Sequence, residues 1–306
     1  MIFIIILGSV LLTILIAFIV ILFLIYRSFF YTPKKDQNDE HKLEGIVKYL
    51  DADKIHGLIN KIQATHHEDL YINSYDGLKL HAFFYENKNS DQYILLFNGY
   101  RGRPRRDYCS RALDLIDAGK NVILCEQRGH GLSEGHTITL GKREQNDVVS
   151  WVKYVRERFG KKAKIAVAGT SFGASTVLLA SNKLPEDVKV FADSAYPGEK
   201  GIVMHIAKMK KYNPKLAWFL VYLSALIFGH VRLNDDVADN VDKSKCKIMI
   251  VHCTGDTLVP MKLNEKLFAL KKDNVKFVFF ENLEHALPYF KEHEKYMKMF
   301  HEFLDA

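Results

Sequence analysis

A serine stands between two glycines at residues 169–173, which read G-T-S-F-G in the spacing G-x-S-x-G. An apolar run at 165–168 precedes these residues, and an apolar helical pattern from Ala174 follows them. A sharp turn from a strand into a helix would raise the serine hydroxyl above the edge of a sheet. Glycine is needed on both sides because a side chain there would collide with nearby backbone. The motif therefore predicts that Ser171 is a nucleophile.

A serine hydroxyl needs a base, and the base needs a carboxylate that orients it. In enzymes with such a turn, the order along the chain is serine, acid, histidine. Asp256 follows an apolar strand pattern at 247–253, and His285 follows another at 275–280. Because the carboxyl ends of parallel strands meet at one edge of a sheet, we expect Ser171, Asp256 and His285 to converge there.

Other residues compete for these roles. Asp193 ends an earlier apolar strand pattern and could also hold the histidine, but the G-D-x-x-V-P turn at Asp256 follows the later strand, where the acid of such a site usually lies. His130 and His136 lie on a loop that could face the same edge. Among the 13 histidines, His252 lies within a strand pattern, and we expect it to pack in the core.

Composition sets limits on the class of protein. The chain has 306 residues, of which 48% are apolar, which fits a globular enzyme with a membrane segment. The net charge of +7 is widely spread and no nucleic-acid motif accompanies it, so an anionic membrane surface is the expected partner and nucleic acid is not. The four cysteines have no metal-ligand spacing and fall mainly beside strand patterns, which indicates buried, reduced thiols and no metal site.

The segment 2–26 is almost entirely apolar. As a helix it would be roughly 37 Å long, enough to cross a bilayer with some tilt. A cleaved signal peptide would need a basic start, a shorter apolar core and a small-residue cleavage site. No basic residue precedes the run, and S-F-F-Y follows at 28–31, so we expect an uncleaved anchor. Arg27, Lys34 and Lys35 flank only its C-terminal side, which predicts a single-pass cell-membrane protein with a cytoplasmic catalytic domain.

The elements that position the site are expected to alternate along the chain. Residues 32–68 read as a polar linker, with a helical patch at Leu43, Ile46, Val47 and Leu50. A hairpin is predicted at 70–74 and 78–83. The further predicted strands are 93–97, 121–126, 164–168, 188–192, 247–253 and 275–280. The predicted helices are 104–118, 143–159, 173–183, 261–271 and 286–304.

This alternation, with continuous apolar strands, predicts an α/β fold with a mostly parallel sheet covered by helices on both faces. The predicted domains are an anchor at 1–31, the linker at 32–68 and a catalytic domain at 69–306. Because the triad and every predicted strand lie beyond the anchor, we expect removal of 1–31 to leave a soluble, active domain.

One segment, 197–245, breaks the alternation because it has no strand pattern. It contains an apolar run at 216–228, whose thirteen residues are too few to cross a bilayer, so a buried or interfacial helix is expected. We interpret the segment as a small helical cap between two late strands. Two alternatives stay open: the cap packs on the core, or it walls an acyl pocket.

Taken together, these motifs resemble the α/β-hydrolase fold. The resemblance is carried by residues 93–100, by E-Q-R-G-H-G-L-S at 126–133, by the G-x-S-x-G and G-D-x-x-V-P motifs, and by His285. Within this fold, the chain is similar to membrane-anchored bacterial hydrolases of the serine aminopeptidase-like (S33-type) and Bem46-like groups. The resemblance covers roughly residues 69–304.

The resemblance implies that Ser171 is the nucleophile, His285 the general base and Asp256 its orienting acid. It further implies an oxyanion hole formed by the N–H groups of Tyr100 and Phe172. The implied activity is a serine hydrolase that cleaves carboxylic esters, with an ester or lipid-like small molecule as substrate, through an acyl-enzyme and without a cofactor. A peptidase or amidase, and a catalytically silent binding module, are the alternatives.

Two positions differ from the usual pattern of this fold. Asn98 stands where histidine usually precedes the oxyanion loop, and Glu126 stands where aspartate usually precedes the R-G-H-G run. Four arginines follow the loop, at positions 101, 103, 105 and 106. If Arg101 and Arg103 line the substrate entrance, they would favour a substrate with a phosphate or carboxylate, such as a lipid headgroup.

Overall fold

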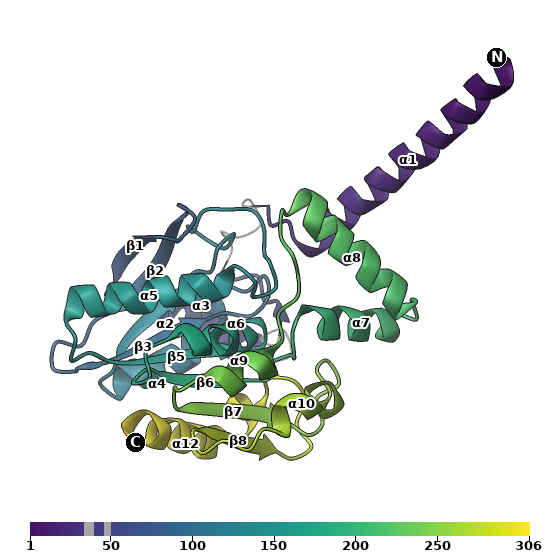
Figure 1. The fold of residues 1–306 in the computed structure, drawn as a ribbon. Coiled ribbons are helices and arrows are strands. Elements are labelled where there is room, and N and C mark those ends of the chain that lie inside the picture. Colours follow the sequence, from purple (N-terminus) through teal and green to yellow (C-terminus); the bar gives the residue numbers. More distant parts are fainter. Residues whose placement is uncertain (34–39, 46–49) are drawn as a thin grey trace.

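The computed structural model describes residues 1–33, 40–45 and 50–306. Its centre is an eight-stranded sheet in the order β1-β2-β4-β3-β5-β6-β7-β8 (Figure 1). The pairs β1–β2 and β2–β4 are antiparallel, and the pairs from β4–β3 through β7–β8 are parallel. The predicted α/β class with a mostly parallel sheet is therefore confirmed.

The strands begin and end within a few residues of their predicted bounds. They are β1 (Glu68–Asn73), β2 (Lys79–Tyr85), β3 (Gln92–Phe97), β4 (Asn121–Cys125), β5 (Lys164–Thr170), β6 (Lys189–Asp193), β7 (Ile248–Cys253) and β8 (Val275–Phe280). Every residue of β4 and β7 is buried, as expected for strands with helices on both faces. Their continuous apolar runs are what made them predictable.

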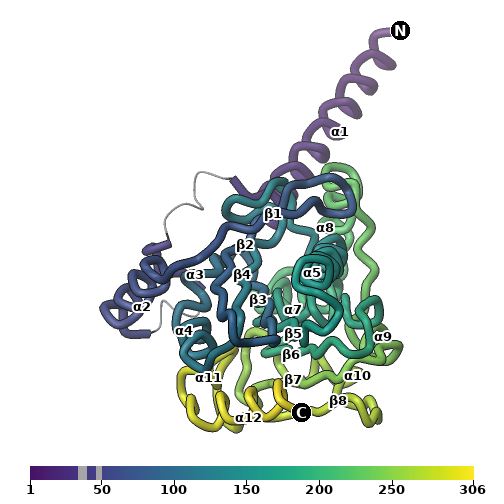
Figure 2. Tube along the Cα trace, turned by 90° about the vertical axis from the view of Figure 1, so that its left-hand side faces the viewer, coloured from purple at the N-terminus to yellow at the C-terminus, as the bar shows by residue number. Residues whose placement is uncertain are grey.

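Two groups of helices cover the two faces of the sheet. One core cluster joins the sheet to α5 (Glu144–Phe159), α6 (Phe172–Ala180) and α9 (Val237–Lys243). The other joins the opposite face to α2 (Ala52–Ala64), α4 (Cys109–Asp117) and α12 (His293–Asp305). Figure 2 shows the strands running between α2 and α4 on one side and α5 and α9 on the other.

Three predicted helices are shorter or divided. The prediction at 104–118 becomes α3 (Pro104–Asp107) and α4, separated at Tyr108. The prediction at 261–271 becomes a 3₁₀ turn (Met261–Asn264) followed by α10 (Glu265–Phe268). The prediction at 286–304 becomes α11 (Pro288–Lys291) and α12. Apolar periodicity continues across these breaks, so it did not reveal them.

Helix α2 was not predicted, because its segment reads as polar linker. The side chain of Asp51 caps it by accepting a hydrogen bond from the N–H of Lys54 (3.0 Å). One face of α2 is buried, at Ile55, Ile59 and Ile62. Ile46 and Val47 of the predicted helical patch, and the flanking Lys34 and Lys35, lie outside the described residues.

Helix α1 (Ile2–Phe29) leaves the rest of the molecule as a long exposed rod (Figure 1). Its 28 residues correspond to roughly 42 Å. Among the described residues, α1 is the one helix long and apolar enough to cross a membrane, and its most apolar stretch is not covered by protein.

The end of α1 packs into the domain. Phe30 is fully buried, and its carbonyl accepts a hydrogen bond from the N–H of Ile138 (2.8 Å). Thr32 donates from its N–H to the carbonyl of His136 (2.9 Å). The predicted boundary after residue 31 therefore falls within a segment that is packed in the domain, since Phe30 and Thr32 are both buried.

The insert between β6 and β7 is helical, as predicted, and comprises α7 (Glu199–Met209), α8 (Pro214–Phe228) and α9. Phe228 contacts α1, with ring centroids 5.4 Å from Phe23 and 5.9 Å from Tyr26. Ile202 and Val203 of α7 belong to the core cluster that also includes Phe30. The insert thus packs on the core and on the base of α1.

Candidate active site

Ser171 lies in the sharp turn between β5 and α6. Its φ of 56° and ψ of −112° place it in a region that non-glycine residues rarely adopt, at a cost of about 1–3 kcal/mol. A Cβ at Gly169 would clash with the backbone of Gly173, and a Cβ at Gly173 would clash with the carbonyl of Phe97. The turn predicted from G-x-S-x-G is therefore present, and both glycines are required by close backbone contacts.

His285 and Asp256 form a close pair. The Nδ1–H of His285 donates to Oδ2 of Asp256 at 2.6 Å, and Oδ1 of Asp256 accepts from the N–H of Val259 at 2.7 Å. The Asp256 side chain is fully buried, while His285 is slightly exposed to the cavity. Both carboxylate oxygens are held, so the orientation of the imidazole is fixed.

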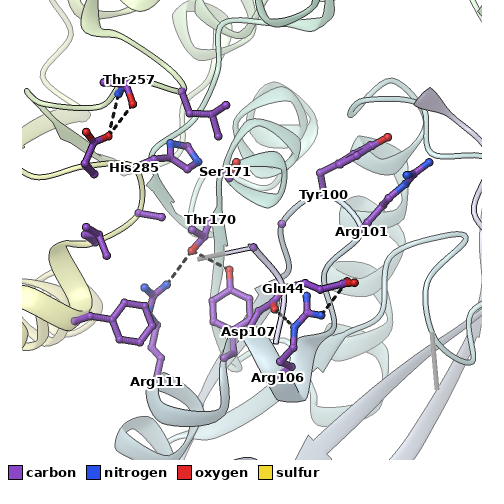
Figure 3. Close-up of a pocket in the computed structure, with 18 residues that line it drawn as sticks. Glu44, Tyr100, Arg101, Arg106, Asp107, Arg111, Thr170, Ser171, Thr257 and His285 are labelled. Atoms are coloured by element: carbon purple, nitrogen blue, oxygen red, sulfur yellow. Dashed lines mark hydrogen bonds and ion pairs between the residues drawn. The ribbon is translucent and has the colours of Figure 1, made fainter. Parts of the chain in front are cut away.

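The loops that carry the pair are tied together. The hydroxyl of Thr257 donates to the carboxylate of Glu284 (2.9 Å), which joins the residue after Asp256 to the residue before His285 (Figure 3). The N–H of Asn282 donates to the hydroxyl of Thr254 (2.9 Å). These contacts hold the acid and the histidine in register although they lie on different loops.

The free nitrogen of His285 lies beside Ser171 (Figure 3). Nε2 is buried and has no hydrogen-bond partner among the described residues, Ser171 included. Hydrogen bonds between a nucleophile and its base are often long without substrate and shorten when substrate binds. The arrangement therefore leaves one imidazole nitrogen ready to accept a proton next to the strained serine.

Asp193, the competing acid, has other partners. It is fully buried, and its Oδ2 accepts from the hydroxyl of Tyr296 (3.0 Å) and lies 3.5 Å from the guanidinium of Arg111. Its Oδ1 accepts from the hydroxyl of Ser194 (3.0 Å). The charge of Asp193 is thus balanced by an arginine and not by the histidine.

His252 lies behind the acid–histidine pair. Its Nε2 donates to the carbonyl of Val259 (2.8 Å) and lies 3.9 Å from Asp256. Burial lowers the pKa of the His252 ring, so the ring is neutral at pH 7 and does not compete as a cation for the carboxylate. The prediction that His252 packs in the core is confirmed.

His130 and His136 do not line the cavity that contains Ser171. The Nδ1 of His130 lies 3.0 Å from the carbonyl of Arg128, and burial lowers the pKa of this ring. His136 stacks on Tyr31, with ring centroids 5.6 Å apart. His136 therefore supports the end of α1, whereas His130 packs under the site, with its ring stacked on Phe172 at a centroid distance of 6.5 Å.

The predicted oxyanion residues flank the serine. Phe172 is the first residue of α6, where helical N–H groups lack partners within the helix. Tyr100 lies on the loop after β3 and lines the cavity. Neither backbone N–H finds a hydrogen-bond acceptor in the part of the chain that the structure describes. Unpaired N–H donors of this kind can stabilise an oxyanion.

Asn98 supports the oxyanion loop in place of the usual histidine. Its side-chain amide donates to the carbonyl of Gly99 (2.9 Å), and its own carbonyl accepts from the side chain of Gln127 (2.7 Å). The N–H of Gly102 also donates to Gly99 (2.9 Å), which closes the loop. The substitution therefore preserves a folded loop by a different set of bonds.

Glu126 has one methylene group more than the aspartate that usually stands at this position. One oxygen accepts from the N–H of Leu132 (2.6 Å) and from the ring of His81 (2.8 Å). The carboxylate also fills the space over Gly131, where a Cβ would clash with it. Glu126 thus ties the R-G-H-G turn to β2, a contact that the sequence alone did not reveal.

The oxyanion loop is bound to the end of α1. The hydroxyl of Tyr100 donates to the carbonyl of Phe29 (2.5 Å). The guanidinium of Arg101 donates to the carbonyls of Ser28 (2.8 Å) and Tyr31 (3.0 Å). These bonds satisfy carbonyls that the end of a helix leaves unpaired, where a cation is also favoured. The partners lie about seventy residues apart, and no local pattern connects them.

The four loop arginines have different surroundings. Arg101 lines the cavity, but its guanidinium is engaged with α1. Arg103 is buried and does not line the cavity; its guanidinium lies 3.8 Å from Glu44, so the predicted entrance role is not supported for this residue. Arg105 pairs with Glu40 (2.9 Å), on the side of the domain that faces α2. Only Arg101 retains the predicted position.

The cavity around Ser171 has a volume of about 770 Å³. Leu258, Leu287, Phe290 and Tyr108 give it apolar walls. No residue of 197–245 is among the lining residues, so the alternative in which the cap walls an acyl pocket is wrong for the described cavity, and the core-packing alternative holds.

Two arginines of the cavity wall are paired with acids. Arg106 is buried and pairs with Asp107 (2.7 Å), whose pKa burial raises. Arg111 donates to the hydroxyl of Thr170 (3.0 Å), the residue before Ser171, and is balanced by Asp193. Sequence reasoning missed Arg111, because it lies in an ordinary amphipathic helix and approaches the site only through the fold.

The structure describes no group of three or more His, Cys, Asp or Glu side chains that could hold a metal ion among residues 1–33, 40–45 and 50–306. All four cysteines are free and buried, as predicted. Burial raises the pKa of Cys253, the thiol nearest the acid, to about 12. Its thiol is therefore not a nucleophile at neutral pH.

Comparisons with known proteins agree with this geometry. Residues 88–220 match the family model of the serine aminopeptidases of the S33 type. An esterase from Pyrococcus furiosus superposes with a TM-score of 0.63 at 22% identity, covering 80% of this chain and 92% of that one. The ferulic-acid-bound Est1E from Butyrivibrio proteoclasticus gives a TM-score of 0.58 at 22% identity, covering 78% and 100%. These likenesses confirm the predicted α/β-hydrolase fold.

Two curated relatives are similar in sequence. The Bacillus subtilis protein YqkD is 26% identical over 196 residues, which are 62% of this chain and 64% of that protein. The lysophosphatidylserine lipase ABHD12 of Danio rerio is 25% identical over 198 residues, which are 62% of this chain and 50% of that protein. The chain thus spans less than two thirds of the length of either relative.

Proposed function

We propose that this chain, which has the α/β-hydrolase fold, is a membrane-anchored serine hydrolase that cleaves carboxylic esters. The observation that carries the proposal is the bond between His285 and Asp256, which leaves Nε2 of His285 beside a strained Ser171. A buried carboxylate, an oriented imidazole and a partly exposed hydroxyl are the parts of an activated serine nucleophile.

The reaction follows from these positions. The hydroxyl oxygen of Ser171 attacks the ester carbonyl while Nε2 of His285 takes its proton, and Asp256 stabilises the imidazolium. The N–H groups of Tyr100 and Phe172 donate to the oxyanion, and loss of one such donor typically costs about 3 kcal/mol. His285 then protonates the leaving alcohol, and a water molecule, deprotonated by the same nitrogen, releases the acid from Ser171.

The substrate proposed is a small ester with an apolar acyl part. The apolar walls of the cavity and its volume of about 770 Å³ suit such a molecule, and the relatives named as esterases or a lipase support the class. A peptidase or amidase remains the second candidate, because the family model that matches residues 88–220 is that of serine aminopeptidases.

The membrane anchor proposed is α1, with the catalytic domain on the cytoplasmic side. Its length and exposed apolar surface support a spanning helix, and Arg27 at its C-terminal end supports the orientation. The full-length protein should stay in membranes washed with alkaline carbonate and should resist protease added outside intact cells. Release by carbonate would refute the anchor. Digestion from outside would show that the catalytic domain lies on the outer side of the membrane.

Covalent labelling tests the catalytic proposal. The full-length protein in membranes is treated with a fluorescent fluorophosphonate, which reacts with activated serines. Labelling is expected for the unaltered protein and for Ser150→Ala, a control on α5, but not for Ser171→Ala. Equal labelling of Ser171→Ala would refute the assignment. Comparison of p-nitrophenyl esters with aminoacyl-nitroanilides then separates the esterase from the peptidase.

A further inference from the structure

Helix α8 is apolar on opposite faces. Val221, Ser224 and Ala225 are buried against the rest of the protein. The outward residues occur at helical spacing and are 38–56% exposed: Leu216, Phe219, Leu226 and Ile227. A helix that is apolar all round is normally covered on every side. The outward face is here named the α8 face and is defined by these four residues. It therefore needs a cover that residues 1–33, 40–45 and 50–306 do not supply.

The position of α8 next to α1 indicates what that cover is. Phe228, at the end of α8, packs on Phe23 and Tyr26 of α1. Residues 2–21 of α1 would span roughly 30 Å, the thickness of the hydrocarbon core, so the contact with Phe228 falls where α1 would leave the bilayer. From that point α8 runs across the direction of α1 and not along it (Figure 1).

Charge near the α8 face has the sign that an anionic surface attracts. Four lysines surround the turn between α7 and α8, and all are exposed: Lys208, Lys210, Lys211 and Lys215. None of them forms an ion pair with a described residue. Tyr212, within the same turn, is 66% exposed. Lysine and an aromatic residue beside exposed aliphatic side chains are typical of elements that lie in a membrane interface.

We propose that the α8 face and the lysine turn lie in the interface of an anionic lipid bilayer. The inference rests on the proposed anchoring by α1 and adds a second point of contact. A helix across the surface would fix the tilt and rotation of the domain, which a single spanning helix cannot do. It would hold the cavity wall at Tyr100 and Arg101, which contact the base of α1, next to the lipid.

Position-specific fluorescence tests this contact. Because all four native cysteines are buried, a single exposed cysteine can be labelled with the fluorophore NBD. Leu216→Cys reports on the α8 face, Leu12→Cys reports on α1, and Lys153→Cys on α5 is the control for a distant exposed site. Each full-length protein is reconstituted in vesicles of phosphatidylcholine, with and without phosphatidylglycerol, and quenching by doxyl-labelled lipid is measured.

NBD at position 216 is expected to be quenched at least about threefold more than at position 153, and more strongly with phosphatidylglycerol. Quenching at 12 but not at 216 would overturn the proposal and leave the anchor in place. Quenching at neither position would refute the anchor itself. Shielding at 216 from a soluble quencher without doxyl quenching, together with a cross-linked dimer, would assign the face to a second copy and overturn the proposal.

A charge variant gives an independent measurement. Replacing the four lysines by glutamine should abolish the effect of phosphatidylglycerol on quenching at 216, because the electrostatic attraction to the anionic lipid is lost. Hydrolysis of a soluble short-chain ester should be unchanged, which shows that the variant is folded. An undiminished effect of phosphatidylglycerol would show that these lysines do not face the lipid.

Discussion

In the proposed mechanism, Ser171 and His285 take part in the same step, so the loss of either residue should have the same effect. Ser171→Ala and His285→Ala should each lower kcat by about three or more orders of magnitude, and the double variant should lose little more. Ester hydrolysis by purified full-length protein measures this. Near-normal hydrolysis by Ser171→Ala would contradict the mechanism.

Substitution of the two buried aspartates should affect different properties: activity for Asp256 and stability for Asp193. Asp256→Asn leaves the imidazole without its carboxylate and should lower kcat by several orders of magnitude. Asp193→Asn should act mainly on stability, because it removes the charge that balances buried Arg111. Comparing kcat with the melting temperature of each variant decides the assignment. A larger loss of kcat in Asp193→Asn would move the acid to β6.

Glu199 should make stability depend on pH. It is fully buried, and burial raises its pKa to about 8, from an ordinary value of 4.5. Its contribution to stability is complete below pH 4.5 and is lost as the pH rises through 8, because only the unfolded chain ionises in that window. Urea unfolding at pH 5 and pH 8 measures the loss, which should be of order 3 kcal/mol.

Glu199→Gln should remove this part of the pH dependence. Glu157→Gln, an exposed position on α5, is the matched control and should behave like the unaltered protein. If the free energy of unfolding depends on pH equally in Glu199→Gln and in the unaltered protein, Glu199 is not the source of that dependence.

At the residue level, the sequence was informative where chemistry is local. The turn at Ser171 is a five-residue motif, and Asp256 and His285 each come soon after an apolar strand pattern. Arg111 and the support given by Glu126 depend on contacts between distant segments, which no spacing reveals. The entrance role predicted for Arg103 assumed that a charged side chain near the site faces solvent, whereas it is buried beside Glu44.

At the level of elements, the central strands were predictable. A strand that is buried on both faces is apolar at every position, and the sequence shows such runs directly. Helix α2 was not predictable, because its few isoleucines stand among polar residues and its packing against the rest of the domain makes it stable. The insert was recognised as a helical cap, but its contact with α1 was not predicted. Its packing on α1 is a contact between two apolar helices that the sequence gives no means to pair.

The hydrogen bond from Tyr100 to the end of α1 can be tested by deleting a single hydroxyl group. Tyr100→Phe keeps the ring and the backbone N–H but loses the bond to the carbonyl of Phe29. A net hydrogen bond is worth about 1 kcal/mol, so kcat should fall roughly three- to tenfold with little change in KM. Tyr71→Phe, an exposed tyrosine on β1, is the control. Unchanged kcat in Tyr100→Phe would show that the bond does not position the loop.

At the scale of the whole molecule, the anchor and the domain are not separate parts. The structure changes the expectation that removal of 1–31 leaves an intact domain, because that cut removes buried Phe30 and the acceptors of Tyr100 and Arg101. Removal of residues 1–21 keeps them.

The shorter truncation should therefore retain a melting temperature and a kcat close to those of the full chain in detergent. The longer truncation should be less stable by about 3 kcal/mol or more, as for the loss of a buried phenylalanine, and less active. Both are measured by thermal unfolding and ester hydrolysis. Equal stability of the two truncations would show that the segment after residue 21 contributes nothing to the domain.

The bonds from the oxyanion loop to α1 end on backbone carbonyls, at Ser28, Phe29 and Tyr31. Every residue type has such a carbonyl, so the side chains of Ser28 and Phe29 can vary without loss of these acceptors. Helical phase, in contrast, cannot vary: one residue inserted among 22–27 would rotate the spanning part by about 100° relative to the domain. The linkage therefore tolerates substitution but not insertion. The number of residues between the membrane span and Ser28 fixes the rotation of the catalytic domain about the helix axis.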